Sequence, residues 1–80
     1  MKFEYSLHWI EQKQIREEIT DDLLEYCILN SSKIKDKEWI DAYNAISKIP
    51  PSGRKLKVVY REVFYEKSKT IKIITAYWLN

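Results

Sequence analysis

The feature that most restricts the fold is the stretch from Gly53 to Leu79, which contains two long runs of β-branched and aromatic residues. The polar tetrapeptide Glu66-Lys67-Ser68-Lys69 separates the two runs. Such residues fit the pleated surface of a sheet, and a short polar break is typical of a hairpin. We therefore expect antiparallel strands over 55–65 and 70–78 at the centre of the sheet. The rest of the chain must pack on this hairpin or pair with it.

Side-chain alternation sorts the hairpin into two faces, because successive residues of a strand point to opposite sides. An antiparallel sheet can bury one face and expose the other. The predicted apolar face comprises Leu56, Val58, Tyr60 and Phe64, with Ile71, Ile73, Thr75 and Tyr77. The opposite, mixed face combines cations with apolar residues and comprises Lys57, Val59, Arg61, Val63 and Tyr65, with Lys72, Ile74, Ala76 and Trp78. We expect any binding surface on the mixed face.

Length and composition indicate one folded domain over residues 1–80. The chain is 45% hydrophobic and 32% charged, which is typical of globular proteins. No apolar run reaches the roughly 20 residues that span a bilayer, and the N-terminus lacks the hydrophobic segment of a signal peptide. Cys27 is the single cysteine, so it forms no internal disulfide and no cysteine metal site. We therefore predict a cytoplasmic protein with no membrane contact and no cofactor.

The net charge of +2 conceals a segregation of charge along the chain. Residues 1–29 contain three basic and seven acidic side chains, whereas residues 30–80 contain eleven basic and five acidic ones. Segregated positive charge attracts polyanions such as nucleic acid. It equally serves as the solvated rim of a basic sheet, so charge alone leaves both interpretations open.

The N-terminal part of the chain predicts a short strand followed by two helices. Alternation of apolar and polar residues over 3–5 indicates a strand at one edge of the sheet. Ser6 is suited to cap a first helix that begins at the next residue. Thr20 is suited to cap a second helix, over about 21–29, which carries negative charge at its N-terminus and a broad apolar surface. We expect this second helix to lie across the apolar face of the hairpin.

Residues 37–49 fit two different structures. They form a helical stripe through Trp39, Ile40, Tyr43 and Ile46, and they equally form one side of a strand through Tyr43, Ala45, Ser47 and Ile49. We favour a strand over 42–49, because its isoleucines are β-branched and the following Pro50-Pro51-Ser52-Gly53 makes a stiff turn into the hairpin. The predicted fold is α+β, in the order β-α-α-β-β-β, with two N-terminal helices on one face of an antiparallel sheet.

Five short features follow one another at regular places in the chain. They are Ser6 with His8, the helix start at Thr20-Asp21-Asp22, the segment AYNAI over 42–46, the segment GRKLKVVY over 53–60, and KIITAY over 72–77. In this order they resemble the RelE/ParE-like toxin superfamily, and most closely its short uncharacterised proteins related to BrnT-type toxins. The resemblance implies a RelE-like fold and, for many relatives, mRNA cleavage that an antitoxin neutralises. Other relatives poison gyrase with the same fold and cut no RNA.

Cleavage of RNA through its 2′-hydroxyl needs a base, a cation at the phosphate and an acid. His8 is the single histidine, and imidazole exchanges protons near neutral pH; the alternative role is a hydrogen bond to a carbonyl at the helix start. Arg54 at the predicted turn and Arg61 on the mixed face are candidate phosphate ligands, or alternatively solubilising charges. The resemblance adds Tyr77, because a C-terminal tyrosine lies by the substrate in RNA-cleaving relatives. The predicted catalytic residues are His8, Arg54, Arg61 and Tyr77.

Cations and an aromatic ring near these residues are the candidate RNA contacts, through phosphate binding and base stacking. The predicted RNA-binding residues are Lys55, Lys57, Lys72 and Trp78. The alternatives are a solvated lysine face, with Tyr77 closing the core and Trp78 covering the sheet edge. A run of acidic residues is explained by charges at helix ends, so we predict no metal site; these residues are Glu17, Glu18, Asp21 and Asp22.

Two functions from different classes follow from these observations. The first is the toxin of a type II toxin–antitoxin pair, an mRNA-interferase-like RNA endonuclease with RNA or the ribosome as target and an antitoxin as partner. The alternative is a non-enzymatic protein-interaction module with a RelE-like fold, whose mixed sheet face or edge binds a protein. The sequence leaves the oligomeric state open.

Overall fold

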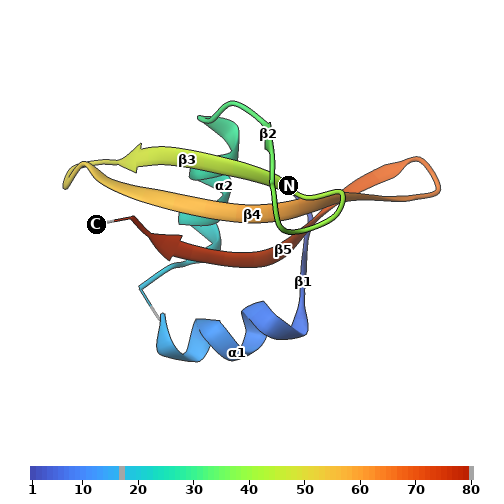
Figure 1. The fold of residues 1–80 in the computed structure, drawn as a ribbon, viewed down its shortest axis with the longest axis horizontal. Helices are drawn as coiled ribbons and strands as arrows, with labels where there is room; N and C mark the ends of the chain where they lie inside the picture. The colour runs from blue at the N-terminus through green and yellow to red at the C-terminus, as the bar shows by residue number, and fades with distance from the viewer. Residues whose placement is uncertain (17, 80) are drawn as a thin grey trace.

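In the computed structural model, residues 1–16 and 18–79 are described, and they form two helices and a five-stranded mixed sheet (Figure 1). Glu17, one of the helix-end carboxylates, lies outside the described residues. The elements are β1 (Phe3–Tyr5), α1 (Leu7–Ile15), α2 (Asp21–Leu29), β2 (Ile34–Lys35), β3 (Tyr43–Ile49), β4 (Arg54–Tyr65) and β5 (Ser68–Trp78). The predicted α+β class is confirmed, and β2 is a strand that the sequence did not predict.

The strand order is β1-β5-β4-β3-β2, so the predicted hairpin of β4 and β5 occupies the centre of the sheet. The segment that fitted both helix and strand is strand β3, which pairs antiparallel with β4 from Tyr43 opposite Tyr60 to Ile49 opposite Arg54. The tight connection between β3 and β4 ends at Gly53, whose φ of 76° is a conformation that glycine adopts without strain.

The prediction of an entirely antiparallel sheet is wrong. Strand β1 runs parallel to β5, with Phe3 opposite Ile71 and Tyr5 opposite Ile73. Parallel pairing is possible here because almost the whole chain lies between the two strands, whereas only adjacent strands joined by a tight turn must be antiparallel. At the other edge, the short β2 pairs antiparallel with β3 through Ile34 and Asn44.

The two helices occupy different places, although both were predicted on one face. Helix α2 packs against β3 and β4 and lies behind the sheet in Figure 1, with Leu24 and Cys27 fully buried. Helix α1 lies beside β5, beyond the end of β1. The Ser6 N–H and the Arg16 guanidinium donate to the carbonyl oxygens of Ile73 and Ala76, both at 2.9 Å. Helix α1 therefore closes an edge of β5 that would otherwise present unpaired backbone groups.

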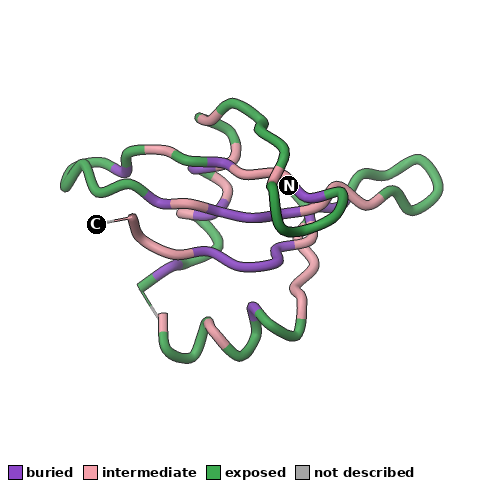
Figure 2. Tube along the Cα trace, in the orientation of Figure 1, coloured by how far each residue is buried: buried purple, intermediate pink, exposed green. Residues whose placement is uncertain are grey.

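The main core lies on the α2 side of the sheet, where Trp9 of α1 and Ile19 complete it. Its buried members are Trp9, Ile19, Leu24, Cys27, Ala45, Ile49, Leu56, Val58, Tyr60, Ile71, Ile73 and Ala76. Figure 2 shows buried residues along the middle of β4 and β5, while the tip of their hairpin is exposed. Phe64 was predicted on the apolar face but is 67% exposed, because it lies near this tip, beyond the end of β3 pairing.

A bulge in β5 changes which residues share a face. Val59 pairs with Thr75, but Tyr60 pairs with Ile73, so Ile74 is an extra residue in β5. An extra residue shifts the alternation of every side chain beyond it. Ala76 and Trp78 therefore join the α2 face, and Thr75 and Tyr77 lie on the opposite face, which corrects the predicted assignment of these residues.

Both predicted helix caps are present. The Ser6 hydroxyl accepts the Trp9 N–H at 3.0 Å, and the Thr20 hydroxyl accepts the Leu23 N–H at 3.3 Å. These bonds satisfy backbone donors at the helix starts, which have no partner within the helix. Neither helix in the described ranges is long and apolar enough to cross a membrane.

Candidate functional site

A pocket of about 540 Å³ lies on the sheet face opposite α2. Its floor comes from β3, β4 and β5, one side from α1, and another side from β2 and the segment that follows it. The lining residues are His8, Ile34, Lys35, Asp36, Lys37, Glu38, Trp39, Asn44, Lys57, Val59, Thr75 and Tyr77. Aromatic rings, cations and amide groups thus converge in one cavity, the combination by which proteins bind small polar molecules or single nucleotides.

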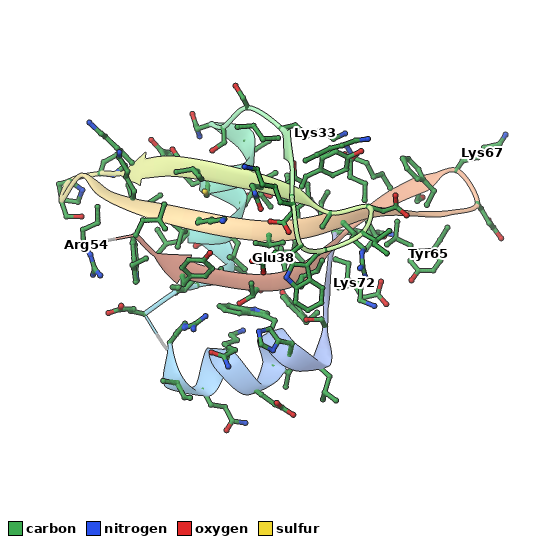
Figure 3. The ribbon with its side chains drawn as sticks, in the orientation of Figure 1. Lys33, Glu38, Arg54, Tyr65, Lys67 and Lys72 are labelled. Atoms are coloured by element: carbon green, nitrogen blue, oxygen red, sulfur yellow. The ribbon has the colours of Figure 1, made fainter. Side chains whose placement is uncertain are left out.

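The wall formed by residues 36–42 is built around a local turn. The Asp36 carboxylate accepts the N–H groups of Glu38 and Trp39, at 2.9 and 2.8 Å. The Asp36 N–H donates to the Ala42 carbonyl at 2.9 Å and closes the segment. In Figure 1 this segment passes in front of β4 and β5, and Figure 3 shows Glu38 over the sheet. It thereby carries Trp39 to the His8 ring of α1, with ring centroids 6.1 Å apart.

The Asp36 carboxyl is held in its charged form. Desolvation raises the pKa of Asp36, but the N–H groups of Trp39 and Glu38, the Asn44 amide and the Lys57 charge outweigh it and leave the pKa below its ordinary value. The Asn44 Oδ1 atom beside it is buried and has no hydrogen-bond partner among the described residues. The negative Asp36 therefore fixes the wall of the pocket.

Tyr77 of the pocket floor lies close to two cations. Lys57 Nζ is 5.6 Å from the ring centroid, and Arg16 Cζ is 5.7 Å from it. The Arg16 guanidinium is fixed by bonds to the Ala76 carbonyl at 2.9 Å and the Thr75 hydroxyl at 3.4 Å. Both cations are placed where an anionic group beside the Tyr77 ring would contact them.

The structure brings together only part of the predicted catalytic set. His8 and Tyr77 line the pocket, with Lys57 of the predicted RNA-binding set. Arg61 lies on the same sheet face, opposite Lys72, but its Nε donates to the Ile40 carbonyl at 3.0 Å. Arg61 is thus engaged in holding the 36–42 segment and does not line the pocket.

Arg54 and Trp78 lie away from the pocket, on the α2 face. The Arg54 guanidinium is 4.4 Å from the Trp78 ring centroid and 3.9 Å from a Glu18 carboxylate oxygen. Figure 3 shows Arg54 and Lys72 toward opposite ends of the hairpin. The predicted catalytic residues His8, Arg54 and Arg61 therefore do not meet at one site.

The mixed face is also less apolar at its surface than predicted. Val59 and Ile74 are buried with Ala42 in a small cluster on this side of the sheet. With Trp78 on the other face, the apolar residues proposed to contact a protein partner are unavailable there. What this face exposes is the lysines Lys48 and Lys55 together with the apolar Ile46, which is 43% exposed.

Most residues of the site were not singled out from the sequence as binding residues, among them Trp39, Asn44 and Arg16. Trp39 and Asn44 belonged to the segment that fitted both helix and strand. A signal for the turn existed, since Asp commonly bonds to N–H groups two residues on. The position of Arg16 against β5 depends on α1 lying at the sheet edge, which local sequence patterns do not specify.

Within residues 1–16 and 18–79, no three His, Cys, Asp or Glu side chains are grouped so as to hold a metal ion. Comparison with protein-family models, with curated proteins and with solved structures gives no match to this chain. The site must therefore be interpreted from its own geometry.

Proposed function

We propose that this protein is a toxin-like RNA endonuclease, whose reaction takes place in the pocket lined by His8, Lys57 and Tyr77. The observation that carries the proposal is that these three side chains line one cavity from three different elements, α1, β4 and β5. They supply an imidazole, an ammonium group and an aromatic hydroxyl. These are the groups that cleavage through a 2′-hydroxyl requires.

In the proposed reaction the His8 imidazole takes the proton of the RNA 2′-hydroxyl. The 2′-oxygen attacks the adjacent phosphorus, and the bond from phosphorus to the 5′-oxygen of the next nucleotide breaks. The Lys57 ammonium stabilises the extra negative charge on the phosphate oxygens, and the Tyr77 hydroxyl donates a proton to the leaving oxygen. The products are a 2′,3′-cyclic phosphate and a free 5′-hydroxyl.

The aromatic side chains of the pocket favour RNA as the substrate over a smaller phosphate ester. Trp39 is 40% exposed and contacts His8, so the two rings border the same cavity. A base turned out of a single strand stacks on such rings. Binding of this kind holds the adjacent phosphate over Lys57.

The test is cleavage of a single-stranded RNA oligonucleotide by purified protein and by variants. We expect His8→Ala and Lys57→Gln each to lower the cleavage rate by about 100-fold or more. Arg54→Gln is the matched control, since Arg54 lies on the opposite face, and it should keep the parent rate. Replacing the 2′-hydroxyl at the cleaved nucleotide by hydrogen should stop cleavage.

If His8→Ala is folded by circular dichroism and still cleaves RNA at the wild-type rate, this pocket is not the catalytic site. In cells, induction should arrest growth and fragment transcripts, and His8→Ala should abolish both effects. Folded wild-type protein that leaves RNA intact and recovers a defined protein partner, with His8→Ala changing nothing, would instead indicate the alternative function, a non-enzymatic protein-interaction module.

A further inference from the structure

A pair of lysines extends the pocket face toward the connection between β3 and β4. Lys48 of β3 lies directly opposite Lys55 of β4, and Lys57 lies two residues further along β4, opposite Ile46. Alternation places all three lysines on the sheet face that carries the pocket. Lys48 and Lys55 are both exposed.

Two like charges opposite each other in adjacent strands are destabilising. No carboxylate within residues 1–16 and 18–79 forms a salt bridge with Lys48, Lys55 or Lys57. Strand β2 pairs with β3 only at Tyr43 and Asn44, so β3 is itself the edge of the sheet at Lys48. A lysine on an exposed edge prevents strand pairing between molecules, which accounts for Lys48. It does not account for Lys55, because β4 is the central strand of the sheet. A bound polyanion would relieve the repulsion between them.

The lysine pair is continuous with the pocket through Lys57. Lys57 lines the pocket and is opposite Tyr77, while Lys55 is about 7 Å further along the same strand. Helix α1 and the 36–42 segment border the pocket on other sides. An extended chain that leaves the pocket across Lys57 therefore meets Lys55 and Lys48 next.

We infer that the substrate is single-stranded RNA of several nucleotides, which runs from the pocket over Lys57 and places its next phosphates at Lys55 and Lys48. This inference rests on the proposed function, because the pocket defines where the cleaved nucleotide lies. The strand must be single because a base in the pocket has to leave its stack. Lys48 and Lys55 are then positioning residues that bind phosphates away from the reacting bond.

The test compares the double variant Lys48→Gln/Lys55→Gln with the control Lys2→Gln/Lys67→Gln, which removes the same charge from exposed lysines elsewhere. Figure 3 shows Lys67 at the hairpin tip, at the far end of the molecule from Arg54 and the connection between β3 and β4. The Kd for fluorescent RNA oligonucleotides of two to ten nucleotides is measured at several salt concentrations.

For long oligonucleotides we expect the Lys48/Lys55 double variant to bind about tenfold more weakly at low salt. The slope of the logarithm of the affinity against the logarithm of the salt concentration should become shallower by about 1.4, because two phosphate contacts are lost. For dinucleotides it should bind like the parent protein, because these do not reach the lysine pair. The Lys2/Lys67 control should match the parent at every length.

The outcomes separate this inference from the proposed function. Suppose that His8→Ala stops cleavage but Lys48→Gln/Lys55→Gln binds long RNA like the parent. The proposed RNA path is then wrong, while the endonuclease function stands. Lys48 and Lys55 would in that case be suited to bind an acidic protein instead. If the parent binds long RNA through the lysine pair but never cleaves it, the path stands and the endonuclease function fails. If the parent binds no RNA, both are wrong.

Discussion

Glu62 connects three parts of the sheet through one carboxylate. It lies on β4, forms a salt bridge with Lys33 ahead of β2, and accepts from Lys69 Nζ of β5 at 3.0 Å. The Lys33 hydrogen bond lowers the pKa of Glu62, desolvation opposes this, and Lys69 adds to the lowering. The Glu62 side chain is only 16% exposed, so its interactions are screened less than those of an exposed pair.

The lowered pKa of Glu62 predicts a loss of stability in acid. The ordinary pKa of a glutamate is 4.5, and the pKa of Glu62 in the folded state is lower. Between these two pKa values the unfolded chain therefore binds more protons than the folded protein. The stabilisation is complete above pH 4.5 and disappears as the pH falls through the folded-state pKa. Thermal unfolding across this range should show Glu62→Gln losing less stability with acid than the parent.

Glu66→Gln is the control for this measurement, because Glu66 forms no salt bridge within the described residues. It should reproduce the acid dependence of the parent. An identical acid dependence for Glu62→Gln and the parent would mean that Glu62 contributes nothing to the pH dependence. Asp36, whose pKa is also below its ordinary value, would then be the next residue to replace.

Individual side chains were the least predictable part of the site. Three of the predicted site residues, His8, Lys57 and Tyr77, line one pocket. Arg54 was grouped with them because a turn was expected to present it at the end of the sheet. Its position in β4 and its contact with Trp78 put it on the other side. Which face a terminal residue of a strand uses depends on pairing register, which the local pattern does not fix.

At the scale of elements, Ser6 joins α1 to the bulge of β5. Its hydroxyl accepts the Trp9 N–H at 3.0 Å and donates to the Ile74 carbonyl at 2.8 Å. Ile74 is the extra residue of the bulge, so its carbonyl needs a partner outside the regular strand pairing. One side chain thus caps the helix and satisfies the irregular strand.

We therefore expect Ser6→Ala to be costlier than the loss of an ordinary cap. Removing the cap costs about 1 kcal/mol, and leaving the Ile74 carbonyl unpaired adds about 1 kcal/mol or more. Thr20→Ala is the matched control, since Thr20 caps α2 through a single bond to the Leu23 N–H. Urea unfolding should give a larger loss for Ser6→Ala. Equal losses would show that the bond to Ile74 contributes nothing.

The bulge in β5 is a feature of the sheet that the sequence does not predict, although most of the elements are predicted. Both strands of the hairpin, both helices with their caps, and β3 follow from alternation, capping residues and turn residues. A bulge leaves no comparable signature in β5, because Ile73, Ile74 and Thr75 are all good strand residues. One inserted residue nevertheless exchanged the faces of Tyr77 and Trp78. The two-residue β2 and the parallel β1 were unpredictable for a similar reason, since pairing partners far apart in sequence decide them.

At the scale of the whole molecule, the two faces of the sheet have different roles. Among residues 1–16 and 18–79, the α2 side contains the main core, and the opposite side contains the small cluster of Ala42, Val59 and Ile74. A single core on one side leaves the other side free to carry the pocket and its lysines. The stability of such a small domain therefore depends on the side chains that α2 contributes.

Leu24 is the residue of α2 on which this dependence is best measured. It is fully buried, and Leu24→Ala removes its contacts with the core without changing the helix, because alanine favours helix at least as well as leucine. The expected loss is about 2–5 kcal/mol. Since small domains have only about 5–15 kcal/mol in total, this single change should lower the melting temperature strongly and bring the domain near its stability limit.

Leu29→Ala makes the same chemical change on the same helix at a residue that is 68% exposed, and it should shift the stability by no more than about 0.5 kcal/mol. The contrast separates burial against the sheet from any effect on helix formation. Equal losses for the two variants would mean that α2 is not docked through Leu24. If Leu24→Ala is too unstable to purify, Leu24→Val, which removes one methylene group, replaces it. Leu24→Val should lose less stability than Leu24→Ala but more than Leu29→Ala.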